Sequence, residues 1–600
     1  MSAWTTVARS PDHSSADHRR HRWATLAVLC VSLLIVSLDN TILNVALPSI
    51  VRDMHATSSD LQWMVDAYAV VFAGLLLVAG GLGDRLGRKP VFLAGLGIFA
   101  AGSSASAFSG SPGHLIAARA FMGIGAAAIM PSTLSILTNV FTDDQERARA
   151  IGIWSGTTGL GVAVGPVAGG WLLAHYWWGS VFLVNVPIAL LGLVAAALLV
   201  PNSRNPGARP PDHVGVVGSI AGMGLLLWGI IEAPERSWAS PWVLGSIVLA
   251  VVVLTAFVLW ERRSDHPMLN LGFFGSRRFS VAIAAMALVI FALMGTLFLL
   301  TQYLQFSLGY SPLQTGIRVA PIAAVLLVAS PLSILLVRWL GTKPVVFLGM
   351  GSIGAGLFLL ARTTTAGTYV DMLPPFFLLG VGAGLAFAPC TESVMGSLPL
   401  DQAGVGSATN SAALQIGGAL GVGVLGSLLN TRYQGHLLPV LAHYPVPKSV
   451  EQLITGSLGG ALGVAAHVGG HAGATLADYA RQAFVDGLDL ALLVGGVVVA
   501  MAAVVVLWLL PNRPVAGHRS DTSSRRTEGV AMSTREPPAA APLEVCDRCG
   551  ATAHVHRGLC RRCHELLVGE GRRMAAERSQ PPHQPEPSPP RQPPWRRRGA

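Results

Sequence analysis

Fourteen apolar segments run through the 600-residue chain, and each is about long enough to cross a lipid bilayer as an α-helix. They cover residues 23–47, 61–82, 90–108, 115–137, 150–173, 180–200, 214–231, 242–260, 279–300, 313–336, 344–360, 373–395, 408–429 and 488–510. Hydrophobic residues make up 52% of the sequence and charged residues only 12%, a balance that excludes a soluble globular class. The sequence therefore predicts an all-α polytopic membrane protein, with the lipid bilayer as its surroundings.

The positive charges predict how these segments are oriented, because short loops rich in Lys and Arg stay in the cytoplasm. With the N-terminus inside, the inside loops hold Arg85, Arg88, Lys89, Arg147, Arg149, Arg204, Arg209, Arg262, Arg263, Arg277, Arg278, Arg338 and Lys343. The outside loops hold Arg52, Arg236, Arg362, Arg432, Lys448 and Arg481. We therefore expect a multi-pass protein of the cytoplasmic (inner) membrane with both termini in the cytoplasm.

The net charge of +10 lies in these loops and in the two termini, so it does not indicate nucleic-acid binding. The first apolar segment is too long for the apolar core of a signal peptide and lacks a clear small-residue cleavage site. We expect it to remain as the first membrane helix.

The turn between the second and third segments carries four charges within residues 84–89, so it cannot lie in hydrocarbon. Residues 80–89 read G-x-L-x-D-R-x-G-R-K, which resembles the loop signature between the second and third helices of the major facilitator superfamily. The matching residues are Gly80, Leu82, Asp84, Arg85, Gly87, Arg88 and Lys89. The resemblance implies a gating loop and a major facilitator fold of two six-helix bundles. The alternative is an ordinary charged inside loop.

An internal repeat supports this organisation, since residues 86–91 (LGRKPV) recur as residues 340–345 (LGTKPV). Segments nine to fourteen then repeat segments one to six, and segments seven and eight are an inserted pair. The second copy is degenerate, because Arg338 stands where Asp84 is expected.

The expected domains follow from this repeat and from changes in composition. A cytoplasmic leader (1–22) precedes an N-terminal bundle (23–200), the inserted pair with linkers (201–278) and a C-terminal bundle (279–510). Within the last, residues 430–486 are expected to form a long outside loop with one short helix on the membrane. A disordered linker (511–541), a zinc-binding module (542–568) and a disordered basic, Pro-rich tail (569–600) complete the chain.

Asp39 places a carboxylate inside the first apolar segment. Burying an ionised group in a bilayer costs several kcal/mol unless it is paired, protonated or hydrated, so Asp39 is a candidate for proton binding. The alternative is a structural acid at a helix contact. Residues 38–48 also resemble the L-D-x-T-I-x-N-V-A-L-P signature of the fourteen-helix drug:proton antiporter branch of the same superfamily.

Arg119 lies in the fourth segment, where a buried guanidinium needs a partner, and Asp39 is a candidate. With Gly123 and Gly125 it matches the family motif R-x-x-x-G-x-G, and the resemblance implies a part in proton transfer. A static ion pair or a backbone clamp is the alternative.

The fifth segment carries the pattern G-x-x-x-G-P-x-x-G-G, formed by Gly161, Gly165, Pro166, Gly169 and Gly170. Glycines at every fourth position make a smooth face for close helix packing, and the proline invites a bend. The pattern resembles the antiporter motif that separates exporters from uptake proteins. The alternative is a generic small-residue packing face.

Two further acids are candidates for proton coupling or for binding a cationic substrate. Asp66 lies near the outer end of the second segment, and Glu392 lies in the twelfth. A solvated interfacial acid and a polar helix contact are the respective alternatives. Gln302, Asn410 and Gln415 could line a pore or bridge helices.

Four cysteines near the C-terminus form two C-x-x-C pairs, Cys546 with Cys549 and Cys560 with Cys563. Two such pairs at this spacing can hold one structural zinc ion in a tetrahedron of thiolates, with His554, His556 and His564 as alternative ligands. This is the one cofactor expected, since none is needed for transport, and the tail's partner is unknown.

The resemblance implies a secondary active transporter, not an enzyme: a proton-coupled antiporter that exports amphipathic small molecules such as drugs or antibiotics by alternating access. No Walker-type phosphate loop is present. One alternative is a dedicated exporter of one endogenous metabolite, lipid or peptide. Another is a membrane-anchored sensor or regulator that acts through the zinc-binding tail. The sequence departs from related pumps at Leu414, which stands where an Arg often precedes the Gln-x-Gly-Gly stretch.

Overall fold

The computed structural model describes residues 22–204, 212–264, 267, 269, 271–398, 403–443 and 446–512, together with four two-residue strands between 544 and 560. Contacts divide the chain into two units, Met1–Gly517 and His518–Ala600. In the described part of the second unit, β1 (Glu544–Val545) pairs with β2 (Thr552–Ala553), and β3 (Val555–His556) pairs with β4 (Leu559–Cys560), both antiparallel. The rest of the fold belongs to the first unit.

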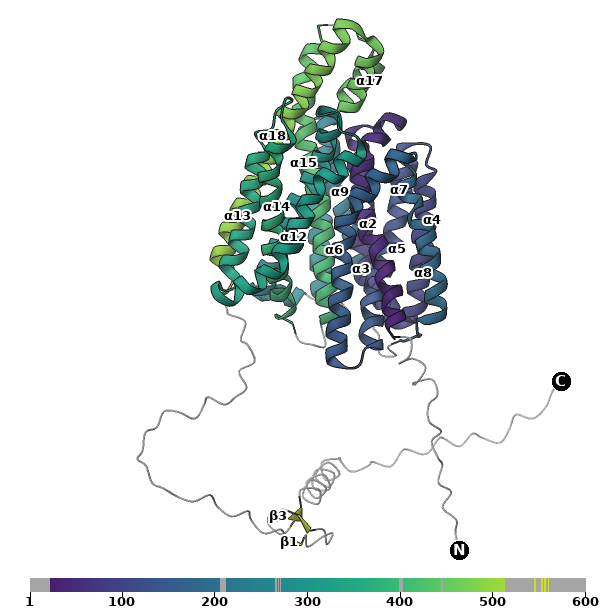
Figure 1. Cartoon of the computed structure of the whole chain (residues 1–600), viewed down its shortest axis with the longest axis vertical. Helices are drawn as coiled ribbons and strands as arrows, with labels where there is room; N and C mark the ends of the chain where they lie inside the picture. The colour runs from purple at the N-terminus through teal and green to yellow at the C-terminus, as the bar shows by residue number, and fades with distance from the viewer. Residues whose placement is uncertain are drawn as a thin grey trace, which may run out of the picture. The chain divides into compact units, whose positions relative to one another are not determined.

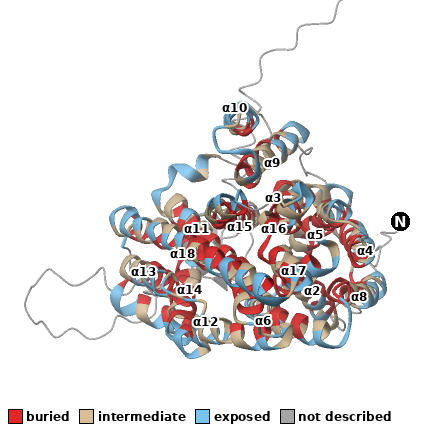
Figure 2. Ribbon diagram, turned by 90° about the horizontal axis from the view of Figure 1, so that it is seen from above, coloured by how far each residue is buried: buried red, intermediate tan, exposed pale blue. Residues whose placement is uncertain are grey.

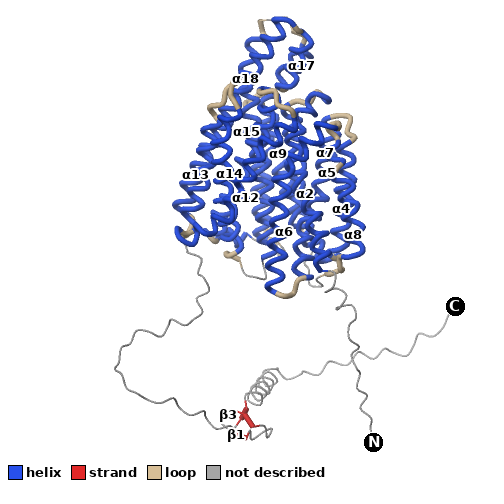
Figure 3. The backbone as a smooth tube through the Cα atoms, in the orientation of Figure 1, coloured by secondary structure: helices blue, strands red, loops and turns tan. Residues whose placement is uncertain are grey.

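The first unit is built of helices (Figures 1 and 3). Its first part contains α2 (Arg22–Met54), α3 (Ser58–Leu86), α4 (Arg88–Ala107), α5 (Pro112–Val140), α6 (Asp144–His175), α7 (Ser180–Leu183) and α8 (Asn185–Leu199). The next part contains α9 (His213–Arg236), α10 (Pro241–Arg263) and the 3-10 turn η1 (Leu271–Gly275). The last part contains α11 (Arg277–Gln302), the π-helical turn η2 (Tyr303–Ser307), α12 (Pro312–Leu340), α13 (Thr342–Leu360), α14 (Tyr369–Met395), α15 (Ala403–Leu441), α16 (Lys448–Gly456), α17 (Leu458–Val468) and α18 (Gly470–Leu509).

Fourteen spans in the described residues are long and apolar enough to cross a membrane, with α7 and α8 counted as one. Each contains or overlaps one of the fourteen apolar segments, so the predicted count is confirmed. With fourteen crossings, the start of the first span and the end of the last lie on the same side of the bilayer.

Local sequence explains where these helices begin and end. Thr57 caps α3, because its hydroxyl accepts a hydrogen bond from Asp60 N (3.1 Å) while the Asp60 carboxylate accepts one from Thr57 N (2.9 Å). Gly87 separates α3 from α4 at φ +114°, and Gly341 separates α12 from α13 at φ +86°. Both glycines belong to the repeated hexapeptide, so the two copies make the same sharp turn, which only glycine adopts readily.

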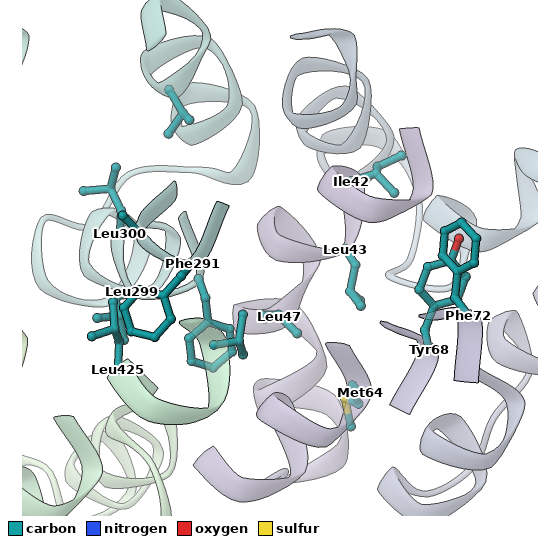
Figure 4. Close-up of a cluster of buried hydrophobic side chains, with 14 of the residues drawn as sticks. Ile42, Leu43, Leu47, Met64, Tyr68, Phe72, Phe291, Leu299, Leu300 and Leu425 are labelled. Carbon is teal, nitrogen blue, oxygen red and sulfur yellow. The ribbon is translucent and has the colours of Figure 1, made fainter. Parts of the chain in front are cut away.

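The helices pack as two groups that meet along two seams. In the first group α5 packs against α3 and α4, and α6 packs against α2. In the second group α14 packs against α12 and α13, and α11 packs against α15. Between the groups, α6 lies against α12 and α3 lies against α15. Figure 4 shows the apolar core where α2, α3, α11 and α15 contribute side chains, including Leu43, Tyr68, Phe291 and Leu425.

The inserted helices α9 and α10 pack on each other at the side of the bundle (Figure 2). Helix α9 also contacts both α3 and α15. Pro234 has no N–H to donate to Ile230 O, and Ser427 Oγ of α15 donates to this carbonyl instead (2.7 Å). The next carbonyl, Ile231 O, accepts a hydrogen bond from Ser59 Oγ of α3 (3.2 Å). Helix α9 is therefore hydrogen-bonded to one helix of each group.

The segment 430–486 is largely helical, whereas the sequence predicted a long loop with one short helix. Helix α15 continues to Leu441, α16 and α17 follow, and α18 begins at Gly470. These parts project beyond the other helices at one end of the bundle (Figure 1). The Tyr433 hydroxyl donates to Ile454 O (2.9 Å), and Leu458 and Ala461 are buried. Short helices held by such tertiary contacts contain no apolar run of spanning length, so a search for spans misses them.

Candidate functional site

Asp39 lies in the middle of α2, is fully buried, and forms an ion pair with Arg119 of α5. One carboxylate oxygen accepts from the guanidinium, and the other accepts a hydrogen bond from Asn185 Nδ2 at the start of α8 (3.2 Å). Three helices of the first group therefore meet at this carboxylate. The structure brings together the two residues that the sequence suggested as partners.

The guanidinium of Arg119 has further neighbours. Its Nε donates to Met64 O of α3 (3.0 Å), and its Cζ lies 4.4 Å from the centroid of the Tyr68 ring and 5.9 Å from that of Phe182. These are cation–π distances. Because the pair is deeply buried, its charges depend on these partners rather than on solvent.

Asn185 is a site residue that sequence reasoning missed. Its amide reaches Asp39 and also lies within 3.4 Å of Ser103 Oγ, which in turn donates to Phe182 O (2.7 Å). The sequence shows Asn185 as the single Asn within the apolar run 180–200. A search for membrane spans does not single out one uncharged polar residue.

A small cavity lies beside the ion pair, between the two groups of helices. Its lining comprises Asn40, Leu43, Asn44, Val65, Ala69, Arg119, Met294, Gln415, Gly418, Ala419 and Val422. Its volume is about 30 Å³, which is room for roughly two water molecules. Drug-sized ligands occupy pockets of roughly 300–1,000 Å³, so the cavity in this conformation is too small to hold one.

The glycine face of α6 packs directly behind Asp39. A Cβ added to Gly161 would lie 2.6 Å from Ser37 Cβ, and one added to Gly169 would lie 2.7 Å from Ile42 Cγ1. Gly165 meets Thr41 in the same way. The opposite side of α6 contacts the second group, where a Cβ on Gly170 would lie 2.6 Å from Pro312 O. Helix α6 thus lies between α12 and the helical turn of α2 that carries Asp39 (the Asp39 turn).

Pro166 of the same motif also takes part in this contact, because its carbonyl lies against Gly316 of α12. Because Gly316 has no side chain, the backbone of α12 can approach the Pro166 carbonyl closely here. The motif therefore serves two helix contacts at once.

The charged turn holds the ends of neighbouring helices together. Arg88 Nε donates to Asp84 Oδ1 (2.9 Å), and Arg88 Nη1 donates to Ser135 O in the last turns of α5 (3.1 Å). Lys89 Nζ donates to Ala197 O near the end of α8 (2.7 Å). Cations at helix C-termini are favoured by the helix dipole. Arg85 is exposed, and Gly80 packs near Pro131.

The two other candidate acids lie apart from this pair. Asp66 is fully buried on α3, where its Oδ2 faces Gly423 of α15, and neither carboxylate oxygen has a hydrogen-bond partner among the described residues. Glu392 is exposed in the last turn of α14, so it does not lie deep in its span as the sequence suggested. Asp489 of α18 is a further half-buried acid. The sequence analysis did not single it out, because it lies at the very start of the predicted span 488–510.

The zinc prediction falls mostly outside the described residues, which exclude Cys546, Cys549 and Cys563. Cys560 is the last residue of β4. Within the described part of the chain, no group of three or more His, Cys, Asp or Glu side chains could hold a metal ion. The zinc site stays a prediction.

The family model described as Major Facilitator Superfamily matches residues 29–422. Over 488 residues the chain is 34% identical to the multidrug efflux pump LfrA of Mycolicibacterium smegmatis, covering 81% of this chain and 95% of that protein. It is 33% identical over 512 residues to the tetracenomycin C resistance and export protein of Streptomyces glaucescens, covering 84% and 94%.

Among solved structures, the chain resembles the inward-facing, unoccupied bacterial homologue of the human lysosomal transporter Spinster. The TM-score is 0.57 at 16% identity, covering 82% of this chain and 98% of that one. At this identity the likeness concerns the fold alone.

Proposed function

The chain belongs to the Major Facilitator Superfamily, and on that premise we propose that it is a proton-coupled antiporter that exports amphipathic small molecules by alternating access. Family membership makes it a membrane transporter rather than an enzyme, with a small molecule as its substrate. Proton coupling, the direction of transport and the cytoplasmic location of both termini belong to the proposal.

The buried pair of Asp39 and Arg119 is the observation that carries proton coupling. An acid held in a membrane helix at this cost is a functional candidate by default. A proton on the Asp39 carboxylate neutralises it and weakens its bond to the guanidinium, which keeps Met64 O and the Tyr68 ring as partners. The two protonation states thus favour different positions of α2 relative to α5.

In the proposed cycle, the cavity lined by Arg119 forms part of the proton's path to Asp39. It has room for roughly two water molecules next to Arg119, and it lies between the two groups of helices. When the groups rock about their two seams, the cavity opens to one side or the other. A proton entering from outside then favours the state that releases substrate outward.

The resemblance of the α6 glycine motif to the signature of exporters, together with the names of the relatives, favours export over uptake. The glycine face of α6 packs on the turn that carries Asp39 and, on its other side, on α12 of the second group. A movement at Asp39 therefore reaches the seam through α6. The two relatives described above, matched over 488 and 512 residues, are named as an efflux pump and an export protein.

Asp39→Asn tests the proposal. In inverted membrane vesicles with an imposed proton gradient, we expect this variant to lose proton-driven substrate uptake while it still inserts at the normal level. Glu232→Gln is the matched control, since Glu232 pairs only with the neighbouring Arg236 on α9 among its described contacts. Wild-type proton-driven transport by the Asp39 variant would refute the assignment.

A dedicated exporter of one endogenous compound would give the same result in that test. A competition panel separates the two, because a multidrug exporter is inhibited by several unrelated amphipathic compounds and a dedicated one by a single chemical class.

A further inference from the structure

We propose that Arg318 of α12 binds the phosphate of an anionic phospholipid such as phosphatidylglycerol. The site lies near the start of α12, on the side of the bilayer opposite to the charged turn at residues 84–89. It binds neither the transported molecule nor the proton, so it goes beyond the proposed function.

The sequence of α12 places Arg318 at the edge of the hydrocarbon core. Residues 319–337 carry no charge, and Arg338 follows them. A helix of this length covers about 28 Å, close to the roughly 30 Å thickness of the hydrocarbon core. The two arginines thus mark the two edges of the hydrocarbon, where the lipid headgroups begin.

Arg318 has no acidic partner among the described residues. Its side-chain contacts there are a long hydrogen bond from Nη1 to Gln314 O (3.5 Å) and two tyrosine rings. The acid in the first turn of α14, Asp371, instead accepts hydrogen bonds from Thr368 N (2.9 Å) and Thr368 Oγ1 (2.7 Å). A charged side chain in a membrane span calls for a counter-charge, and the described part of the chain supplies none.

Two tyrosines hold the guanidinium in place. Its Cζ lies 4.0 Å from the centroid of the Tyr310 ring and 5.4 Å from that of Tyr369, both of which are cation–π distances. The Tyr369 hydroxyl also donates to Arg318 O (3.1 Å), which fixes the start of α14 beside α12. A side chain that is already oriented loses less conformational entropy when it binds a ligand.

One end of the guanidinium is open to the surroundings. The Nε atom of Arg318 is buried without a hydrogen-bond partner. The Nη2 atom also lacks a partner among the described residues, but it is not a buried atom. Because the guanidinium is a planar fork, its terminal nitrogens can donate to two oxygens of one phosphate.

The surface next to Arg318 favours a lipid phosphate over a free anion. Ile317 and Val328 lie on one face of α12, three turns apart, and are 54% and 73% exposed. An acyl chain below the headgroup would cover this apolar face, whereas a soluble anion would gain nothing from it. The site therefore suits a molecule with a negative head and an apolar tail.

Lipid binding to the purified full chain in a non-ionic detergent, measured by native mass spectrometry, tests the proposal. Dioleoylphosphatidylglycerol carries the phosphate, and dioleoylglycerol has the same tails without it. We expect the phospholipid to bind roughly tenfold more tightly, the net effect of hydrogen bonds to a charged group. Inorganic phosphate alone should bind much more weakly than the phospholipid, and equally tight binding would overturn the assignment to a lipid.

Three variants make the test specific. Arg318→Gln should lower phosphatidylglycerol binding to about the level of dioleoylglycerol. Arg338→Gln is the matched control, because it removes the same charge from the exposed opposite end of the same helix, and it should bind as the wild type does. Arg318→Lys keeps the charge without the planar fork, so binding should fall several-fold. This last variant retains a cation at the membrane surface and therefore separates lost recognition from lost folding.

Three results would overturn the proposal: unchanged binding in Arg318→Gln, equal losses in Arg318→Gln and Arg338→Gln, or wild-type binding in Arg318→Lys. The second and third would show that only net charge attracts the lipid. The outcome is independent of the proposed antiport, since Asp39→Asn should lose proton-driven transport and still bind phosphatidylglycerol like the wild type.

Discussion

The contact between α6 and the Asp39 turn allows a prediction with its control on the same helix. In Gly161→Ala the new Cβ would lie 2.6 Å from Ser37 Cβ and 3.2 Å from Leu34 O. Carbon atoms in contact lie about 3.5–4.0 Å apart, so α6 and α2 must separate by roughly 1 Å. Overpacking of this kind costs about 1–3 kcal/mol, partly offset by about 1 kcal/mol gained when Ala replaces Gly in a helix.

Gly156→Ala is the control, because a Cβ at this position would meet nothing within 4 Å. It receives the helix-propensity gain without the overpacking, so the two variants should differ by about 1–3 kcal/mol. Thermal melting in detergent should give a lower Tm for Gly161→Ala than for Gly156→Ala. Drug export should fall several-fold in the first variant and stay at the wild-type level in the second, since only the first displaces the turn that holds Asp39.

Equal Tm values and equal export in the two variants would refute this reasoning. They would mean that α6 and α2 have enough freedom to take up a methyl group, and that the glycine face does not transmit a displacement from Asp39 to the seam.

Two further predictions concern the guanidinium and the tail. Arg119→Lys should lower export roughly tenfold or more in an efflux assay with normal membrane insertion, because one ammonium cannot reach both Asp39 and Met64 O in place of a planar guanidinium. Export at the wild-type rate would show that charge alone suffices. Truncation after Asn512 should preserve export and remove about one bound zinc ion per chain in elemental analysis, whereas loss of export would favour a working part in the tail.

The fourteen spans were predictable because the bilayer requires long apolar helices and expels charge to the loops. The pairing of Asp39 with Arg119 was also within reach, since each buried charge demands an opposite one. The same logic did not find Asn185, because a neutral amide costs too little to stand out from an apolar run. It also placed Glu392 too deep, since a helix boundary a few residues away decides whether that acid is exposed.

The surroundings of Asp66 depended on a contact that sequence does not encode locally. Its neighbour Gly423 lies more than three hundred positions away in the chain, and α9 comes from the inserted pair. The helices within 430–486 were missed for a related reason. They are held by tertiary contacts such as the hydrogen bond from the Tyr433 hydroxyl to Ile454 O, not by a continuous apolar pattern.

The proline in α9 has a mechanical consequence. By leaving Ile230 O free, Pro234 gives Ser427 of α15 a place to attach, one residue before the carbonyl that Ser59 of α3 holds. If α3 and α15 separate during a transport cycle, α9 cannot stay hydrogen-bonded to both helices. At least one of the two hydrogen bonds, from Ser427 or from Ser59, must then break. Helix α9 would then bridge the seam between α3 and α15, and one of its two serine hydrogen bonds would break and re-form in each transport cycle.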